Sequence, residues 1–141
     1  MHNQNRIYQE EDLVPIQNLM SELGYPVEIA ELKENIRQIR EKEGEIFVHR
    51  LNGEVVGCVC VLMDVRLAEG IYAEIVSLIV SEKERGKGIG AELVKEAEEW
   101  ARPRAGKIRV RANVVREAAY SFYTSQGYNH VKSQNVFIKY V

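Results

Sequence analysis

The stretch Arg85-Gly86-Lys87-Gly88-Ile89-Gly90 lies between an apolar run, Ile75 to Val80, and an amphipathic run that begins at Ala91. This order predicts a strand, a basic glycine-rich loop and the start of a helix. Glycines let successive backbone N–H groups turn toward one point, and the helix adds the positive end of its dipole. Since Arg85 and Lys87 add charge, the unit is suited to hold a phosphate or pyrophosphate; the alternative is an ordinary loop.

Length and composition indicate a single soluble domain. The chain has 141 residues, enough for one compact core and too few for two, so we expect residues 1–141 to form one domain. Apolar residues make up 45% of the chain, charged residues 28%, and the net charge is −2. This balance offers no basic excess for a phosphate backbone, so we expect no nucleic acid partner.

No targeting, membrane or metal signal stands out. Residues 1–6 are polar, and no run approaches the ~20 apolar residues of a membrane helix, so we expect a cytoplasmic protein without membrane association. Cys58 and Cys60 are two positions apart in an apolar run, so on a strand both side chains lie on the same face. We expect them to be buried, reduced thiols. The three histidines are scattered along the chain without metal-ligand spacing, so we expect no metal.

Apolar spacing predicts the order of the elements, with period 2 for strands and period 3.6 for helices. The expected strands are 7–8, 46–51, 55–63, 72–80, 107–112 and a closing pair, 128–132 and 136–140. The expected helices are 13–23, 29–43, 89–102 and 117–125. This order predicts an α/β (α+β) fold, in which a mixed, mostly antiparallel sheet is flanked by about four helices.

Local signals refine these boundaries. Asp12 is placed to cap the first helix, and Gly24 ends it. Asn52-Gly53 is a strong hairpin signal, and residues 64–70 read as a loop. In strand 107–112, basic residues alternate with apolar ones.

Three segments together resemble one enzyme family. The loop is neither a Walker A sequence nor a Rossmann fingerprint, because Lys87 precedes no Ser or Thr and the glycines read G-x-G-x-G. Residues 85–90 resemble instead the R-x-x-G-x-G signature of the GNAT superfamily, the Gcn5-related N-acetyltransferases. Ala119-x-x-Phe122-Tyr123-x-x-x-Gly127-Tyr128 is similar to a second family segment, and Leu23-Gly24-Tyr25-Pro26 looks like the family's substrate-side loop.

The resemblance implies a GNAT-like acyl-CoA N-acyltransferase fold and transfer of acetyl from acetyl-CoA to a primary amine, by direct attack in a ternary complex. Acetyl-CoA is then a co-substrate, and Tyr25 faces the acceptor. In the region where the family often has Asn, this chain has Arg116, and an Asn ends the preceding strand. The coenzyme-binding residues implied by the resemblance are Leu78, Ile79, Val80, Arg85, Gly86, Lys87, Gly88, Ile89, Gly90, Asn113, Ala119 and Tyr123.

The chemistry of amide formation requires acid–base groups. An alkyl amine with a pKa near ~10.4 is mostly protonated at pH 7, so a base must remove a proton before attack. Glu74 resembles the general-base glutamate of the histone-acetyltransferase branch; otherwise it is a solvated or ion-paired strand carboxylate. Tyr123 is the candidate general acid for the departing thiolate, and otherwise an aromatic core residue. A backbone N–H of residues 78–80 is implied as the donor to the thioester oxygen.

Two other functions and several acceptors stay open. The chain is alternatively a non-catalytic acyl-CoA-binding or sensing module, or a protein-interaction domain with an accidental glycine loop. The acceptor is a small-molecule amine, such as an aminoglycoside-like compound, a polyamine or an amino-acid derivative, or a protein amine. Glu22, Glu28 and Glu31 attract a cationic acceptor or form a solvated helix face. We expect a monomer or a homodimer.

Overall fold

The chain forms two compact units, Met1–Val110 and Arg111–Val141. The computed structural model describes residues 4–112 and 117–141. That all 141 residues act as one domain therefore stays a prediction.

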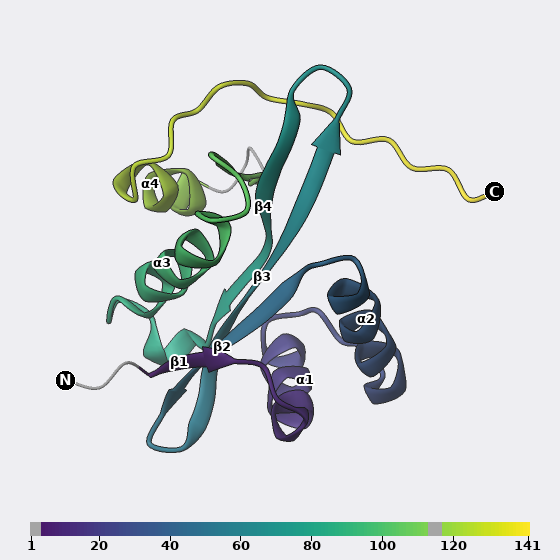
Figure 1. The fold of residues 1–141 in the computed structure, drawn as a ribbon. Coiled ribbons are helices and arrows are strands. Elements are labelled where there is room, and N and C mark those ends of the chain that lie inside the picture. Colours follow the sequence, from purple (N-terminus) through teal and green to yellow (C-terminus); the bar gives the residue numbers. More distant parts are fainter. Residues whose placement is uncertain (1–3, 113–116) are drawn as a thin grey trace. The chain divides into compact units, whose positions relative to one another are not determined.

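The first unit is built on a five-stranded sheet in the order β1-β2-β3-β4-β5 (Figure 1). The first four strands pair antiparallel, and β5 pairs parallel with β4. The strands are β1 (Asn5–Ile7), β2 (Glu45–Leu51), β3 (Glu54–Arg66), β4 (Gly70–Val80) and β5 (Ile108–Val110).

Helices cover both faces of this sheet (Figure 1). The helices α1 (Leu13–Glu22) and α2 (Ile29–Glu41) pack on one face, and α3 (Ile89–Ala101) packs on the other against β2, β3 and β4. Parallel strands need a crossover connection, and α3 supplies it between β4 and β5. With α4 (Glu117–Ser125) in the second unit, the predicted mixed sheet with four helices is confirmed.

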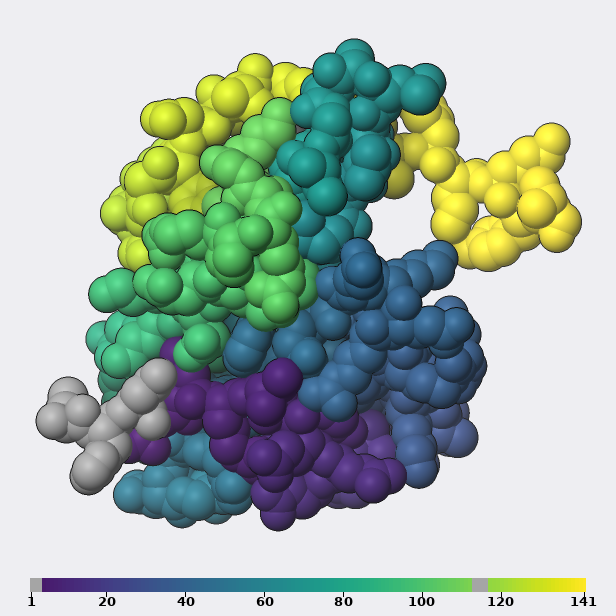
Figure 2. Space-filling view, in the orientation of Figure 1, coloured from purple at the N-terminus to yellow at the C-terminus, as the bar shows by residue number. Residues whose placement is uncertain are grey.

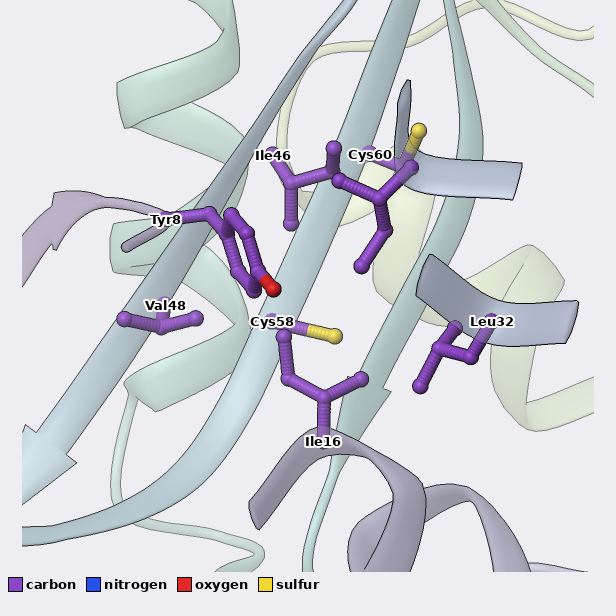
Figure 3. Close-up of a cluster of buried hydrophobic side chains, with 8 residues drawn as sticks. Tyr8, Ile16, Leu32, Ile46, Val48, Cys58 and Cys60 are labelled. Atoms are coloured by element: carbon purple, nitrogen blue, oxygen red, sulfur yellow. The ribbon is translucent and has the colours of Figure 1, made fainter. Parts of the chain in front are cut away.

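A core of apolar side chains fills the space between the sheet and α1 and α2 (Figure 3). Cys58 and Cys60 point into it from β3, as their alternation predicts. Both are free thiols, and burial raises the pKa of each to about 12. The prediction of buried, reduced cysteines is therefore confirmed. The core residues are Tyr8, Ile16, Leu32, Ile36, Ile46, Val48, Cys58 and Cys60.

A glycine allows α3 to approach the opposite face of the sheet closely. Leu93, Val94 and Ala97 of α3 are fully buried there. A Cβ added to Gly57 of β3 would lie 3.0 Å from Leu93 Cδ1 and 3.1 Å from Ile79 O, closer than ordinary contact. The first turns of α3 therefore rest directly on the backbone of β3.

The prediction that Asp12 caps the first helix is wrong. The Asp12 side chain does not cap α1: its oxygens accept hydrogen bonds from Arg6 Nη2 at 2.7 Å and from the Gln9 backbone N–H at 2.9 Å. The preceding 3-10 turn, η1 (Glu10–Asp12), places the carboxylate beside the Arg6 guanidinium, whose charge makes it the stronger partner.

The predicted loop 64–70 is shorter than expected. The β3–β4 ladder continues to the pair Arg66–Gly70, and this hairpin projects past α1 and α2 (Figure 2). Asp64 and Arg66 read as loop residues because they are charged, but they pair with each other at 2.9 Å. Side chains that pair in this way can lie on a strand.

The second unit consists of α4 and an extended segment. After Ser125 no helix or strand is found in the described residues of this unit. The predicted strands 128–132 and 136–140 are wrong, although Val136, Phe137 and Ile138 are exposed apolar residues. Apolar residues with β propensity indicate a capacity for pairing, but a strand forms only on a hydrogen-bonded partner strand.

Candidate active site

The predicted phosphate loop lies at the end of β4, as expected. A 3-10 turn, η2 (Glu82–Glu84), leads into it, and α3 begins at Ile89. Gly86 and Gly88 have φ angles of 79° and 82°, a left-handed backbone that favours glycine. A Cβ added at either glycine would meet nothing within 4 Å. The backbone turn therefore requires these glycines, and it leaves open space around them.

The loop presents backbone donors to that space. The first α3 hydrogen bond runs from Glu92 N–H to Gly88 O at 3.1 Å, so the helix supplies no acceptor for the N–H groups just ahead of it. Lys87 pairs with Glu84 at 2.6 Å. Among the described residues, no carboxylate lies within ion-pair distance of Arg85, whose Nε donates to Val80 O at 3.3 Å. Unsatisfied N–H groups, the helix dipole and the Arg85 charge together fit an anionic group.

Glu22 at the end of α1 holds the turn before the loop. Its Oε2 accepts hydrogen bonds from Ser81 Oγ at 3.0 Å and from the Glu82 N–H at 3.1 Å. The sequence groups Glu22 with acidic residues that attract a cationic acceptor or form a solvated helix face, and it does not predict this contact. No local signal indicates it, since the partners are 59 and 60 residues apart.

The strand β4 opens toward the loop. Cys60 pairs with Ser77 and Val61 with Ile75, so Val76 is an extra residue that forms a β-bulge. The β4–β5 pairing covers only residues 73–75 of β4. In the part of the chain that the structure describes, residues 76–80 therefore have a partner strand on one edge only. Backbone N–H groups of Leu78, Ile79 and Val80 lie along this opened half of β4.

Glu74 lies just before the bulge and is buried. Arg109 Nε donates to Glu74 Oε1 at 2.6 Å, and Arg109 Nη2 forms an ion pair with the same oxygen. Arg109 Nη2 also donates to Asp64 Oδ2 at 3.0 Å. Of the two non-catalytic alternatives for Glu74, the ion-paired carboxylate is present. The pairing does not test a role as a base.

Tyr25 follows α1 in the first unit. Its N–H donates to Met20 O at 2.8 Å across Gly24, whose φ of 87° ends the helix as predicted. Tyr25 is 46% exposed and lies on the loop between α1 and α2. Tyr25 thus lies on a surface loop, and its substrate-side role stays a prediction.

Tyr123 belongs to α4 in the second unit. Its ring packs edge-on against Phe122 at 5.0 Å and Tyr128 at 5.7 Å. Burial raises the pKa of its hydroxyl, so Tyr123 is protonated at neutral pH. Ala119 lies one turn earlier on the same helix. Asn113 lies outside the described residues.

A cavity of about 360 Å³ in the first unit contains none of the residues predicted for the site. It lies beside α1 and the β2–β3 hairpin, and it touches the turn before the loop at Ser81. Acidic and basic side chains line it together, so its charge does not select one class of ligand. The lining residues are Glu11, Asp12, Pro15, Asn18, Leu19, Glu22, Arg50, Gly53, Glu54, Val55, Val56, Ser81 and Lys83.

The described residues contain neither a metal-ligand cluster nor a membrane-spanning helix. No group of three or more His, Cys, Asp or Glu side chains is arranged to hold a metal ion. No described helix is both long and apolar enough to span a membrane.

Comparisons with known proteins agree on one family. The model of the Acetyltransferase (GNAT) family matches residues 10–128. The chain is 37% identical over 79 residues to an aminoalkylphosphonate N-acetyltransferase from Salmonella typhimurium, a match that spans 55% of this chain and about half, 51%, of that protein.

Solved structures show the same fold. A putative acetyltransferase from Agrobacterium tumefaciens has a TM-score of 0.83 and 23% identity, over 96% of this chain and 99% of its own. An aminoglycoside N-acetyltransferase, AAC(6′)-Iy, solved in complex with CoA, has a TM-score of 0.86 and 12% identity, over 98% of this chain and 95% of its own.

Proposed function

The chain belongs to the GNAT family of acetyltransferases, and from this premise we propose that it transfers an acetyl group from acetyl-CoA to a primary amine. The amine attacks the thioester directly while both substrates are bound, and residues 1–141 act as one N-acetyltransferase domain. The observation that carries the proposal is the loop at the start of α3, where two open left-handed glycines follow the strand whose edge is exposed.

Residues 85–90 hold the pyrophosphate of the coenzyme in this proposal. The N–H groups at the start of α3 donate to phosphate oxygens, and Arg85 adds a charge that no described carboxylate balances. The opened half of β4 at residues 78–80 takes the pantetheine arm and supplies an N–H donor to the thioester oxygen. Ala119 and Asn113 contact the coenzyme by their place in the family pattern.

Glu74 and Tyr123 carry the proton transfers. The acceptor ammonium loses a proton to the Glu74 carboxylate, directly or through one water, and the free amine then attacks the carbonyl carbon. The C–S bond breaks as the amide C–N bond forms, and the Tyr123 hydroxyl protonates the departing thiolate. The second proton that the nitrogen loses passes through water and restores the Tyr123 hydroxyl, and the proton held by Glu74 leaves to solvent. A raised pKa keeps that hydroxyl protonated until it is needed. Two acid–base groups favour an enzyme over a sensing module, which needs neither.

We propose a small-molecule amine as the acceptor, bound beside Tyr25. The name of the Salmonella relative, an aminoalkylphosphonate N-acetyltransferase, supports this class. The test is release of coenzyme A thiol with a panel of amines that includes aminoalkylphosphonates, aminoglycosides, polyamines, amino-acid derivatives and lysine peptides. Turnover with peptides alone would contradict the small-molecule class. No turnover, together with tight acetyl-CoA binding, would favour the sensing module.

Calorimetry with acetyl-CoA tests the loop. Arg85→Ala removes a charge-assisted contact of about 1.5–3 kcal/mol, so affinity should fall roughly 10- to 100-fold. Arg102→Ala is the matched control, because Arg102 follows the opposite end of α3 and pairs with Glu99 on the surface. Equal affinity of both variants and the wild type would remove the loop from the proposal.

A further inference from the structure

Glu74 and Arg109 face each other across the parallel ladder of β4 and β5. They are register partners, so their side chains leave the sheet on the same face. The guanidinium contacts Glu74 Oε1 through both Nε and Nη2. Side-chain exposure is 12% for Glu74 and 22% for Arg109, so solvent screens this pair far less than an ordinary surface pair.

Arg109 is itself held on two further sides. Its Nη2 donates to Asp64 Oδ2 at 3.0 Å, and its guanidinium carbon lies 4.0 Å from the centre of the Tyr72 ring. A guanidinium fixed by two carboxylates and an aromatic face has little rotational freedom.

Two further charged residues, Arg66 and Lys107, contact the residues that hold Arg109. Arg66 Nε donates a hydrogen bond to Asp64 at 2.9 Å. This hydrogen bond is the largest of the causes that lower the pKa of Asp64. Lys107 Nζ lies 5.5 Å from the Tyr72 ring centre and donates to Glu69 O at 3.0 Å. Among the described residues, the charges that the printed contacts place near Glu74 include Arg109 on β5 and Asp64 on β3, with Arg66 and Lys107 farther out.

We propose that Arg109 is a positioning residue, which holds Glu74 in place as the carboxylate that accepts the proton of the acceptor amine. This inference rests on the proposed role of Glu74. A buried carboxylate without its cation gains a proton readily, and a protonated Glu74 cannot act as a base. The proton passes from the ammonium nitrogen to the Glu74 carboxylate, and the nitrogen keeps the electron pair with which it attacks.

Arg109→Met tests this directly, because it removes the charge and retains much of the side-chain length. We expect kcat to fall about 10-fold or more, since a general base supplies at least that factor. The acidic limb of the kcat/KM pH profile should move to higher pH, because the variant lacks the opposite charge that favours the ionised form of a neighbouring carboxylate. Acetyl-CoA affinity should not change. Arg109→Lys should restore part of kcat and move the limb back.

Arg66→Met is the matched control, because Arg66 contacts Asp64 but not Glu74 in the structure. Its pH profile should match that of the wild type. Asp64→Asn provides a second variant if Arg109→Met fails to fold: it removes one of the two carboxylates that hold the guanidinium, so kcat should fall by a smaller factor than in Arg109→Met.

A double-substitution cycle separates positioning from general destabilisation. In a Glu74→Gln background, Arg109→Met should cause little further loss of kcat. An equal loss in both backgrounds, or an unchanged pH profile in folded Arg109→Met together with an unchanged kcat in Asp64→Asn, would overturn the positioning role. The proposed function fails separately, if the wild type neither binds acetyl-CoA nor acetylates any amine.

Discussion

Gly57→Ala tests whether close packing under α3 supports the loop at residues 85–90. The added Cβ would lie 3.0 Å from Leu93 Cδ1, 3.1 Å from Ile79 O and 3.3 Å from Ile89 Cγ2. The two methyl groups can shift by a few tenths of an ångström, but Ile79 O belongs to the backbone of β4 and cannot move cheaply. The strain therefore displaces the first turns of α3, which begin at the loop.

Overpacking of this kind costs about 1–3 kcal/mol. Replacing glycine by alanine also reduces the entropy of the unfolded chain, which stabilises the folded state by about 0.4–1 kcal/mol where the backbone is compatible. The net destabilisation should be about 0.5–2 kcal/mol. At about 2–4 °C per kcal/mol for chains near this length, Tm should fall by roughly 1–8 °C.

Gly106→Ala is the matched control. Gly106 has no positive φ, and a Cβ added there meets nothing within 4 Å. The control should therefore keep or raise the stability, and the difference between the two variants isolates the contacts under α3. Both are measured by thermal and urea unfolding and by acetyl-CoA calorimetry. If Gly57→Ala is as stable as Gly106→Ala and binds acetyl-CoA equally well, close packing does not support the loop.

Three further predictions concern other parts of the chain. Tyr123→Phe keeps the ring but removes the hydroxyl, so turnover should fall by ~10²-fold or more at unchanged acetyl-CoA affinity; wild-type turnover would leave Tyr123 a packing residue. Cys58 and Cys60 should react with a thiol reagent such as DTNB only after unfolding, because burial raises both pKa values to about 12. Burial lowers the pKa of His49, so the unfolded chain binds its proton first and stability should fall from pH 7 to pH 5. His49→Gln should flatten that fall in Tm, and an equally steep fall in the variant would assign it to other groups.

The sequence was sufficient where the signal is local. Asn52-Gly53 forms the predicted hairpin turn, with φ angles of 52° and 80°. Residues 85–90 form the predicted loop because glycine spacing acts over a few residues. The α4 bounds, Glu117–Ser125, match the prediction for the same reason.

The contacts that position the candidate site were not predictable. Arg109 appears in the sequence as one of several basic residues along a strand, and only the β4–β5 register places it opposite Glu74, 35 residues away. The bulge at Val76 leaves no mark in the apolar run, because a bulge depends on how two strands pair.

Local motifs and contacts set by strand register differ in how well they distinguish an enzyme from a sensing module. The loop residues that identify the family bind the coenzyme in our proposal, so a sensing module would keep all of them. The partners that an enzyme additionally needs, such as Arg109 beside Glu74, come from register between strands and leave no motif. A relative that kept residues 85–90 but lost Arg109 would match the family equally well and bind acetyl-CoA, yet turn over slowly. In our proposal, cross-strand pairing at Glu74, and not the glycine loop, is therefore the feature that separates an enzyme from a binder.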